Sequence, residues 1–431
     1  MKKLILIALA YSISLSLIAS NEGETRTTTV KREIASSDVI VIEAKNTELA
    51  IETWNKSEVE IEATVRFDGK LTDKMQDFLN DFETRVRENI SSSEGEFKID
   101  SDLDLPNKIQ IGSKSVGINI SFGDDELKII YRIKAPGTNK YVISNSYEDV
   151  RLVGSFDNME LKQYSGELEA EKIDQAKLNL KYGSATIKEI GIGDIELYEQ
   201  ELNISDINKL TLNAKYSDLE LERVNEIDAI SYETDFQVST IETLTGNYKY
   251  GEINIGRKLD QSELVLYEME IEAEEIGSLR LENSKYSKIF IDKIGSLVFD
   301  QSYEDEVEIG VLGSFQSLES KYGNHSIDLL EGKLELNAYE NDIEIDRLAS
   351  TVTEVTIDGK YIESSIGIGD ISYILKTNIK YGELDYDESA MDVRRYIKES
   401  DRLEVEAHSK NMSGNPVKIS IKGYEVDVKL Y

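Results

Sequence analysis

The chain has 431 residues, of which 49 are basic and 84 are acidic, and its formal net charge at pH 7 is −35. This negative charge argues against nucleic acid or an anionic membrane surface as a partner. Cysteine is absent, so neither a disulfide framework nor a cysteine-linked lipid anchor is available, and stability must come from the apolar core.

The N-terminus has the features of a cleaved secretory signal. Lys2 and Lys3 precede an apolar run over residues 4–19, with small residues at its end. We therefore predict a signal peptide over residues 1–20 and an exported protein of the periplasm, cell surface or extracellular space. No other stretch is apolar enough to span a bilayer, so no integral membrane segment is expected after cleavage.

Residues 21–135 combine strands with an insertion. Period-two alternation over residues 36–66 predicts strands, and a segment of about residues 67–126 interrupts it. Within the insertion, apolar residues at helical spacing predict one amphipathic helix over about residues 71–90. These residues are Leu71, Met75, Phe78, Leu79, Phe82 and Val86.

Tyrosine then recurs every 16 to 22 residues across the middle of the chain. The series comprises Tyr147, Tyr164, Tyr182, Tyr198, Tyr216, Tyr232, Tyr250, Tyr267, Tyr286, Tyr303, Tyr322, Tyr339, Tyr361 and Tyr381. Two forms alternate, Lys-Tyr-(Gly/Ser) and Tyr-Glu, and the apolar residues that follow lie one position later after the Tyr-Glu form. That shift predicts a corner one residue longer in alternate units. A fixed period indicates supersecondary units that bury their apolar faces by stacking.

Residues 136–390 are predicted to form an all-β, single-stranded β-solenoid of about 14 or more short coils. Apolar residues alternate with period two, and repeated Ile-Gly-Ser and Ile-Gly-Asp corners suggest glycines with positive φ. At a rise of about 4.8 Å per coil, the rod would be roughly 65 Å long. A meander of hairpins is the alternative, but the corners lack the Asn-Gly and Asp-Gly pairs that tight hairpins prefer.

Residues 391–431 are predicted to cap the solenoid. The tyrosine period lapses there, yet alternation persists near Leu403 and again near Val417. Terminal caps with a polar outer face keep such repeat proteins soluble.

Motifs that could carry chemistry are weak. Asp100–Asp104 resembles the start of a calcium loop but lacks its glycine and final glutamate, and Gly191–Gly193 and Gly367–Gly369 lack the third glycine of a phosphate loop. The two histidines are His325, expected to be solvated in a corner, and His408. With 84 acidic residues, chance carboxylate pairs are uninformative. We therefore expect no catalytic residue, no metal site and no cofactor.

The tyrosines admit two orientations. Strand parity places Tyr182 and Tyr216 toward the interior, as part of a buried column. Parity points other tyrosines outward, where they form a candidate surface binding stripe. The stripe consists of Tyr198, Tyr232, Tyr267, Tyr303 and Tyr339. A structural ladder is favoured over a ligand-binding strip, because packing requires complete periodicity and binding seldom does.

The alternating segment Asp38–Ile42, the Ala135–Gly137 sequence and the Lys-Tyr-Gly units resemble the proposed adhesins of Gram-negative envelopes, a family of domains of unknown function with repeated β-strands. The resemblance implies a right-handed β-helix and offers no catalytic residues. It favours a non-enzymatic adhesin-like or scaffold module that binds an envelope protein or a surface glycan. The alternative is a β-helix carbohydrate-active enzyme, such as a polysaccharide lyase or hydrolase.

Overall fold

The computed structural model describes residues 24–69, 71–103, 127–412 and 414–431. Strands dominate the described chain, which contains the α-helix α1 (Asp73–Glu88) and the short 3-10 helix η1 (Glu388–Ala390). The predicted all-β class with a helical insertion is confirmed. The predicted signal peptide, residues 1–20, lies outside the described residues.

The strands fall into a group before the long strand β9 and a group after it. The first group is β1 (Glu24–Glu33), β2 (Val39–Lys45), β3 (Glu48–Trp54), β4 (Glu58–Phe67), β5 (Ile90–Ser93), β6 (Glu96–Asp100), β7 (Leu127–Pro136) and β8 (Lys140–Ser146), followed by β9 (Val150–Lys285). The second group is β10 (Lys288–Phe299), β11 (Ser302–Tyr303), β12 (Glu306–Lys321), β13 (Asn324–Leu330), β14 (Leu334–Leu348), β15 (Glu354–Ile366), β16 (Tyr373–Lys380), β17 (Leu384–Asp385), β18 (Met391–Lys398), β19 (Leu403–Ser409) and β20 (Val417–Leu430).

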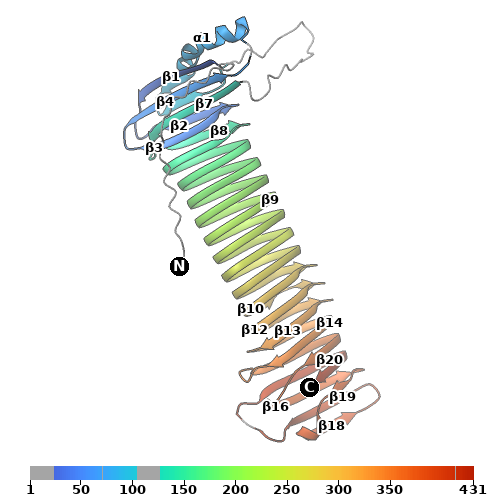
Figure 1. The fold of residues 1–431 in the computed structure, drawn as a ribbon. Helices are drawn as coiled ribbons and strands as arrows, with labels where there is room; N and C mark the ends of the chain where they lie inside the picture. Colours follow the sequence, from blue (N-terminus) through green and yellow to red (C-terminus); the bar gives the residue numbers. More distant parts are fainter. Residues whose placement is uncertain (1–23, 70, 104–126, 413) are drawn as a thin grey trace, which may run out of the picture.

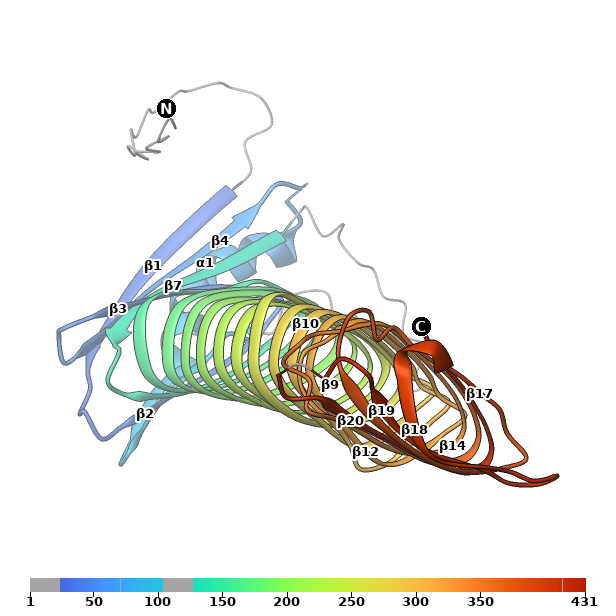
Figure 2. The same ribbon diagram turned by 90° about the horizontal axis from the view of Figure 1, so that it is seen from below.

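Parallel pairing at a fixed offset organises the middle of the molecule. Ile289 in β10 lies beside Ile271 in β9 and beside Val307 in β12, 18 residues away in each direction. The pairs that link β8 to β15 are all parallel, whereas a meander of hairpins would give antiparallel pairs. Figure 1 shows β9 as a stack of similar turns along one axis, and Figure 2 shows these turns overlying one another. We call one such turn a rung.

Apolar side chains from successive rungs fill the space that each rung encloses. Residues at equivalent positions, such as Ile271, Ile289 and Val307, are buried and stack along the axis. The alternation of buried and exposed residues along each strand is the period-two pattern read from the sequence.

Glycines allow neighbouring rungs to approach closely. The prediction of positive φ holds for Gly154 and Gly369, but it is wrong for Gly277, Gly295 and Gly313. A Cβ atom on Gly295 would lie 2.6 Å from the carbonyl oxygen of Gly277, and one on Gly313 would lie 2.2 Å from that of Gly295. These glycines are therefore required by backbone contact between rungs and not by backbone conformation.

The N-terminal end is capped by additional strands and by α1. Strand β3 pairs with β9 and β7, and β7, β4 and β1 continue as antiparallel neighbours. Strand β2 pairs with β8 and β6, and β6 forms a hairpin with β5 that the sequence did not predict. Helix α1 begins after Thr72, whose hydroxyl accepts a hydrogen bond from the Met75 N–H, and it buries the predicted apolar stripe from Met75 to Val86.

The C-terminal end contains an excursion from the stack. Strand β20 pairs in parallel with β15 and, on its other side, with β16. Strands β16, β19 and β18 pair antiparallel in that order and extend the end of the rod. The last strand of the chain therefore lies between two strands that precede it in sequence.

Candidate functional site

Fifteen tyrosine rings form one continuous ladder along the rod. Consecutive centroids are 5.0 to 5.8 Å apart, and the interplanar angles of 63 to 79° are those of edge-to-face contacts. The order is Tyr147, Tyr164, Tyr182, Tyr198, Tyr216, Tyr232, Tyr250, Tyr267, Tyr286, Tyr303, Tyr322, Tyr339, Tyr361, Tyr424 and Tyr381.

Each ladder tyrosine lies at a corner with one left-handed residue. In the Lys-Tyr form the tyrosine itself is left-handed, with φ of 58° at Tyr322. In the Tyr-Glu form the glutamate is left-handed, with φ of 52° at Glu304, except at Tyr147-Glu148, where the tyrosine is left-handed. Tyr303 pairs laterally with Lys321, so Glu304 and Tyr322 occupy equivalent positions in adjacent rungs. The corner has the same length in both forms, and the prediction of a longer corner after Tyr-Glu is wrong: the tyrosine moves by one position instead.

The alternation of the two forms has a physical cause. If every rung carried tyrosine at one position, the rings would repeat at the strand spacing of about 4.8 Å and face one another as a sandwich. Aromatic rings prefer edge-to-face contacts at larger centroid separations. Moving the tyrosine between two neighbouring positions in successive rungs permits that geometry. The sequence period of two rungs is therefore the period of this ring packing.

The ladder lies on the outside of the rod. Tyr182 and Tyr216 are 40% and 43% exposed, so the prediction that they point into the interior is wrong. The prediction from strand parity was wrong because the alternation of side chains is interrupted at a left-handed residue. The side chain of that residue points outward, as does the side chain of the residue before it. Tyr198, Tyr267 and Tyr339 are half-buried and belong to the same ladder.

The predicted stripe is every second ring of this ladder over its middle part. Its members alternate with left-handed tyrosines, one of which, Tyr216, the sequence had assigned to the interior. They are Tyr198, Tyr232, Tyr267, Tyr303 and Tyr339. Tyr424, which the regular spacing missed, lies between Tyr361 and Tyr381. The dipeptide Tyr424-Glu425 is the sequence signal that could have revealed it.

Charged side chains flank the rings on both sides. The position that carries tyrosine in one rung carries lysine in the next, as with Tyr303 and Lys321, and the other position alternates between tyrosine and glutamate. Hydrogen bonding to the following glutamate, together with burial and the carboxylate charge, raises the pKa of Tyr267 and of Tyr303. These phenols are thus neutral donors at neutral pH. The ladder is an aromatic spine with a lysine row on one flank and a glutamate row on the other.

Polar side chains also lie inside this corner, near one end of the rod. The Asp305 carboxylate accepts hydrogen bonds from the Ser287 N–H at 2.9 Å and the Ser302 hydroxyl at 2.7 Å, while burial raises the pKa of Asp305. His325 Nε2 lies 3.1 Å from the Asn341 amide, and burial lowers the pKa of His325 to about 4. The expectation of a solvated His325 is wrong, since the side chain is fully buried.

This buried cluster does not form an accessible catalytic site. Asp305 and His325 are both enclosed by the stacked rungs, so a substrate in solution cannot reach them. Among the described residues, no group of three or more His, Cys, Asp or Glu side chains could hold a metal ion. Gly191–Gly193 lies within β9 and is followed by strand, and Asp104 of the calcium-like segment lies outside the described residues.

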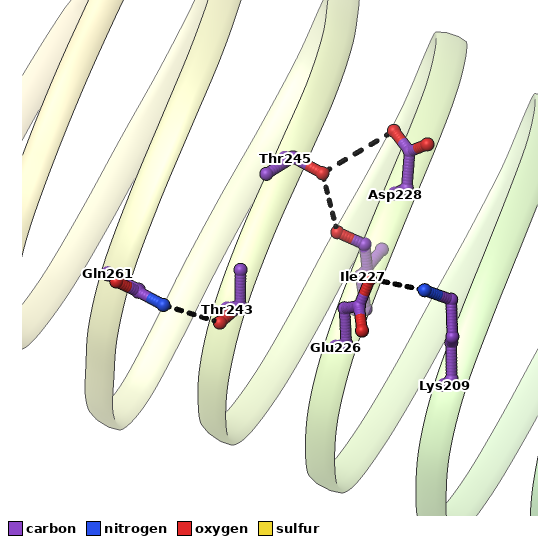
Figure 3. Close-up of polar contacts among 7 residues, drawn as sticks. All are labelled: Lys209, Glu226, Ile227, Asp228, Thr243, Thr245 and Gln261. Carbon is purple, nitrogen blue, oxygen red and sulfur yellow. Dashed lines mark hydrogen bonds and ion pairs between the residues drawn. The ribbon is translucent and has the colours of Figure 1, made fainter.

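Elsewhere on the surface, polar side chains mainly contact the equivalent position one rung away. Lys209 Nζ lies 2.6 Å from the Glu226 carboxylate, and the Gln261 amide donates to the Thr243 hydroxyl at 3.0 Å (Figure 3). The Thr245 hydroxyl donates to the backbone carbonyl of Ile227 at 3.2 Å. Such contacts explain how acidic rungs stack, because cations and hydroxyls bridge neighbouring carboxylates and carbonyls.

Comparisons with known proteins give no family. No family model and no curated protein matches the chain. Among solved structures, the chain is similar to a protein from Clostridium sporogenes assigned provisionally to cell adhesion, with 9% identity, coverage of 95% of this chain and 100% of that one, and a TM-score of 0.16. A TM-score this low supports no inference about function. No helix in the described part of the chain is long and apolar enough to cross a membrane.

Proposed function

We propose that the chain is an exported, non-enzymatic right-handed β-solenoid of about 14 or more coils that acts as an adhesin-like or scaffold module in the cell envelope. The parallel register of β9, β10 and β12, with 18 residues per rung, supports the solenoid. The basic and apolar segment at residues 1–20 supports export. The enzyme alternative gains no specific support, because the buried Asp305 and His325 are inaccessible.

The observation that carries this proposal is the exposed tyrosine ladder. Eight of its rings are 40% or more exposed and together present roughly 700 Å² of ring surface. Contiguous patches of this size on soluble proteins usually mark interaction sites. A ladder with a purely structural role would not need to keep this ring surface exposed to solvent along its whole length.

The ladder geometry favours a partner that forms hydrogen bonds and ion pairs. Each inner ring has neighbouring rings on both sides along the rod, as Tyr216 has Tyr198 and Tyr232. The outer ring edges and hydroxyls remain, with lysines and glutamates beside them. An extended protein segment or polysaccharide of the envelope could bind several equivalent rungs at once. Each contact would be weak, and affinity would grow with the number of rungs engaged.

The experiment compares wild type with Tyr267→Phe and with the triple variant Tyr198→Phe, Tyr267→Phe and Tyr339→Phe. Phenylalanine keeps the ring contacts and removes the outward hydroxyls, so the ladder stays folded. Binding to purified envelope polysaccharide and to an envelope protein fraction should fall modestly in the single variant and steeply in the triple variant. Tyr248→Phe, which alters a buried ring, is the matched control and should bind like wild type.

Three outcomes would contradict the proposal. One is wild-type binding that the triple variant leaves unchanged. Another is polysaccharide turnover abolished by a single carboxylate substitution, which would establish the enzyme alternative. The third concerns export: a protein that reaches the periplasm equally well without residues 1–20 would remove the basis for the signal peptide.

A further inference from the structure

Strands β16, β18 and β19 lie at the end of the rod opposite α1 (Figure 1). The segments that adjoin them line a groove.

 The groove has a volume of about 350 Å³. The end groove is formed by the segment after β16, by η1 and by the turn between β18 and β19. Its size is within the range of small-ligand sites in proteins.

The tyrosine ladder ends at one wall of this groove. Tyr381 lines the groove and contacts a single ladder ring, Tyr424, at a centroid distance of 5.3 Å. Every inner ladder tyrosine has two ring neighbours, so the terminal ring keeps one side open. Tyr381 is accordingly 57% exposed. Tyr396 also lines the groove, is 51% exposed, and contacts no other ring in the described part of the chain.

Polar groups surround these two open rings. Carboxylates of Glu383, Glu388, Glu399 and Asp401 line the groove, and none of them forms an ion pair within the described residues. Arg402 is held by Glu404 and therefore presents a fixed guanidinium at the edge. The groove thus combines apolar ring surfaces with several free hydrogen-bond acceptors.

A third tyrosine makes the site unusual. Tyr386 lines the groove, and its buried hydroxyl has no hydrogen-bond partner among the residues that the structure describes. A buried polar group left unpaired costs about 1–3 kcal/mol. A ligand hydroxyl that formed a hydrogen bond with this phenol would remove that cost.

We infer that this groove binds one or two pyranose units of a neutral or amino sugar. The apolar C–H face of a pyranose packs against an open aromatic ring, and its hydroxyls donate to carboxylates. The groove contains four carboxylates but only two cations, Lys398 and Arg402, and Arg402 is already paired with Glu404. This excess of negative charge disfavours the binding of acidic sugars. The inference is independent of binding along the side of the rod, because the inner ladder rings lack the open side that Tyr381 has.

The experiment measures binding of the full chain to a glycan array with neutral, amino and acidic sugars, followed by calorimetry with the best ligand. Tyr381→Asn should weaken binding by about tenfold or more through the lost ring contact. Asparagine tolerates the left-handed conformation at this position, where φ is 52°. Tyr431→Asn is the matched control, since Tyr431 is 53% exposed and belongs neither to the ladder nor to the residues that line the groove. It should bind like wild type.

Tyr396→Ala provides a second test that does not disturb the ladder, and it should also weaken binding by about tenfold. The inference is overturned if wild type binds no glycan, if it binds acidic sugars only, or if both groove variants bind like wild type. Tyr147→Asn alters the opposite end of the ladder, so a loss of glycan binding in that variant would place the ligand on the ladder and overturn the groove assignment. The triple phenylalanine variant alters the side of the rod and leaves the groove intact. Its effect on binding along the ladder therefore does not change the result for the groove, and the two proposals can be tested separately.

Discussion

The contact between Tyr216 and Tyr232 can be isolated with a double-mutant cycle. Their centroids are 5.6 Å apart at an interplanar angle of 76°. Tyr216→Ala removes two edge-to-face contacts of about 0.5–1.5 kcal/mol each and the burial of about half a ring, so we expect a loss of about 2–4 kcal/mol. Backbone strain is unchanged, because alanine and tyrosine are both unfavourable at the left-handed φ of 55°.

The cycle separates ring contact from burial. If the rings interact directly, Tyr216→Ala with Tyr232→Ala should cost less than the sum of the single variants by about 0.5–1.5 kcal/mol. Tyr216→Ala with Tyr286→Ala is the control, because three ladder rings lie between them and their effects should add within about 0.5 kcal/mol. Urea unfolding followed by far-UV circular dichroism provides the free energies. Additivity in the contacting pair would refute the ladder as a source of stability.

Three further substitutions test the corner, the core and the glycine column. Glu233→Gly at a left-handed φ of 45° should raise the free energy of unfolding by about 1 kcal/mol in urea unfolding, and a loss would contradict corner strain. The pKa of His325 is about 4 in the folded chain and returns to 6.5 on unfolding, so the unfolded chain binds the additional proton as the pH falls. The free energy of unfolding should therefore decrease by about 3 kcal/mol between pH 7 and pH 4. His325→Ile should remove this contribution from unfolding curves measured at different pH values. Gly295→Ala should cost about 1–3 kcal/mol, whereas Gly256→Ala, whose Cβ would have 4.0 Å of clearance, should lower the melting temperature little or not at all.

The repeat could be predicted from the sequence because its signals are local and occur many times. The tyrosine spacing and the period-two alternation anticipated stacked strands at a fixed period, and the parallel offset of 18 residues between Ile271 and Ile289 agrees with that spacing. The helical stripe of the insertion also anticipated α1. Both patterns are set by which face of a local element is buried.

The orientation of the tyrosines could not be predicted from parity. Alternation assumes that every residue is extended, and one left-handed residue per corner breaks that assumption. Tyr216 therefore projects outward although its parity matches buried leucines before it. The prediction that His325 is solvated was wrong for a different reason. His325 follows a corner, but it occupies the strand position of the buried residues Val307 and Ile343 in neighbouring rungs.

The end groove could not be predicted because it depends on long-range order. Tyr381 and Tyr424 are adjacent in the ladder only because β20 inserts between β15 and β16. No local pattern records that insertion. Tyr396 reaches the groove from β18, which joins the sheet through β19.

Charge along the ladder differs from charge over the rest of the chain. The net charge of −35 makes most approaching anionic surfaces unfavourable. At the ladder, however, a lysine such as Lys285 alternates with a glutamate such as Glu304 in successive rungs, so the strip is close to neutral over each pair of rungs. Another molecule can therefore approach the rings with less electrostatic repulsion than it meets elsewhere on the rod. The same alternation that permits edge-to-face ring packing thus also leaves one side of an acidic rod open to a partner.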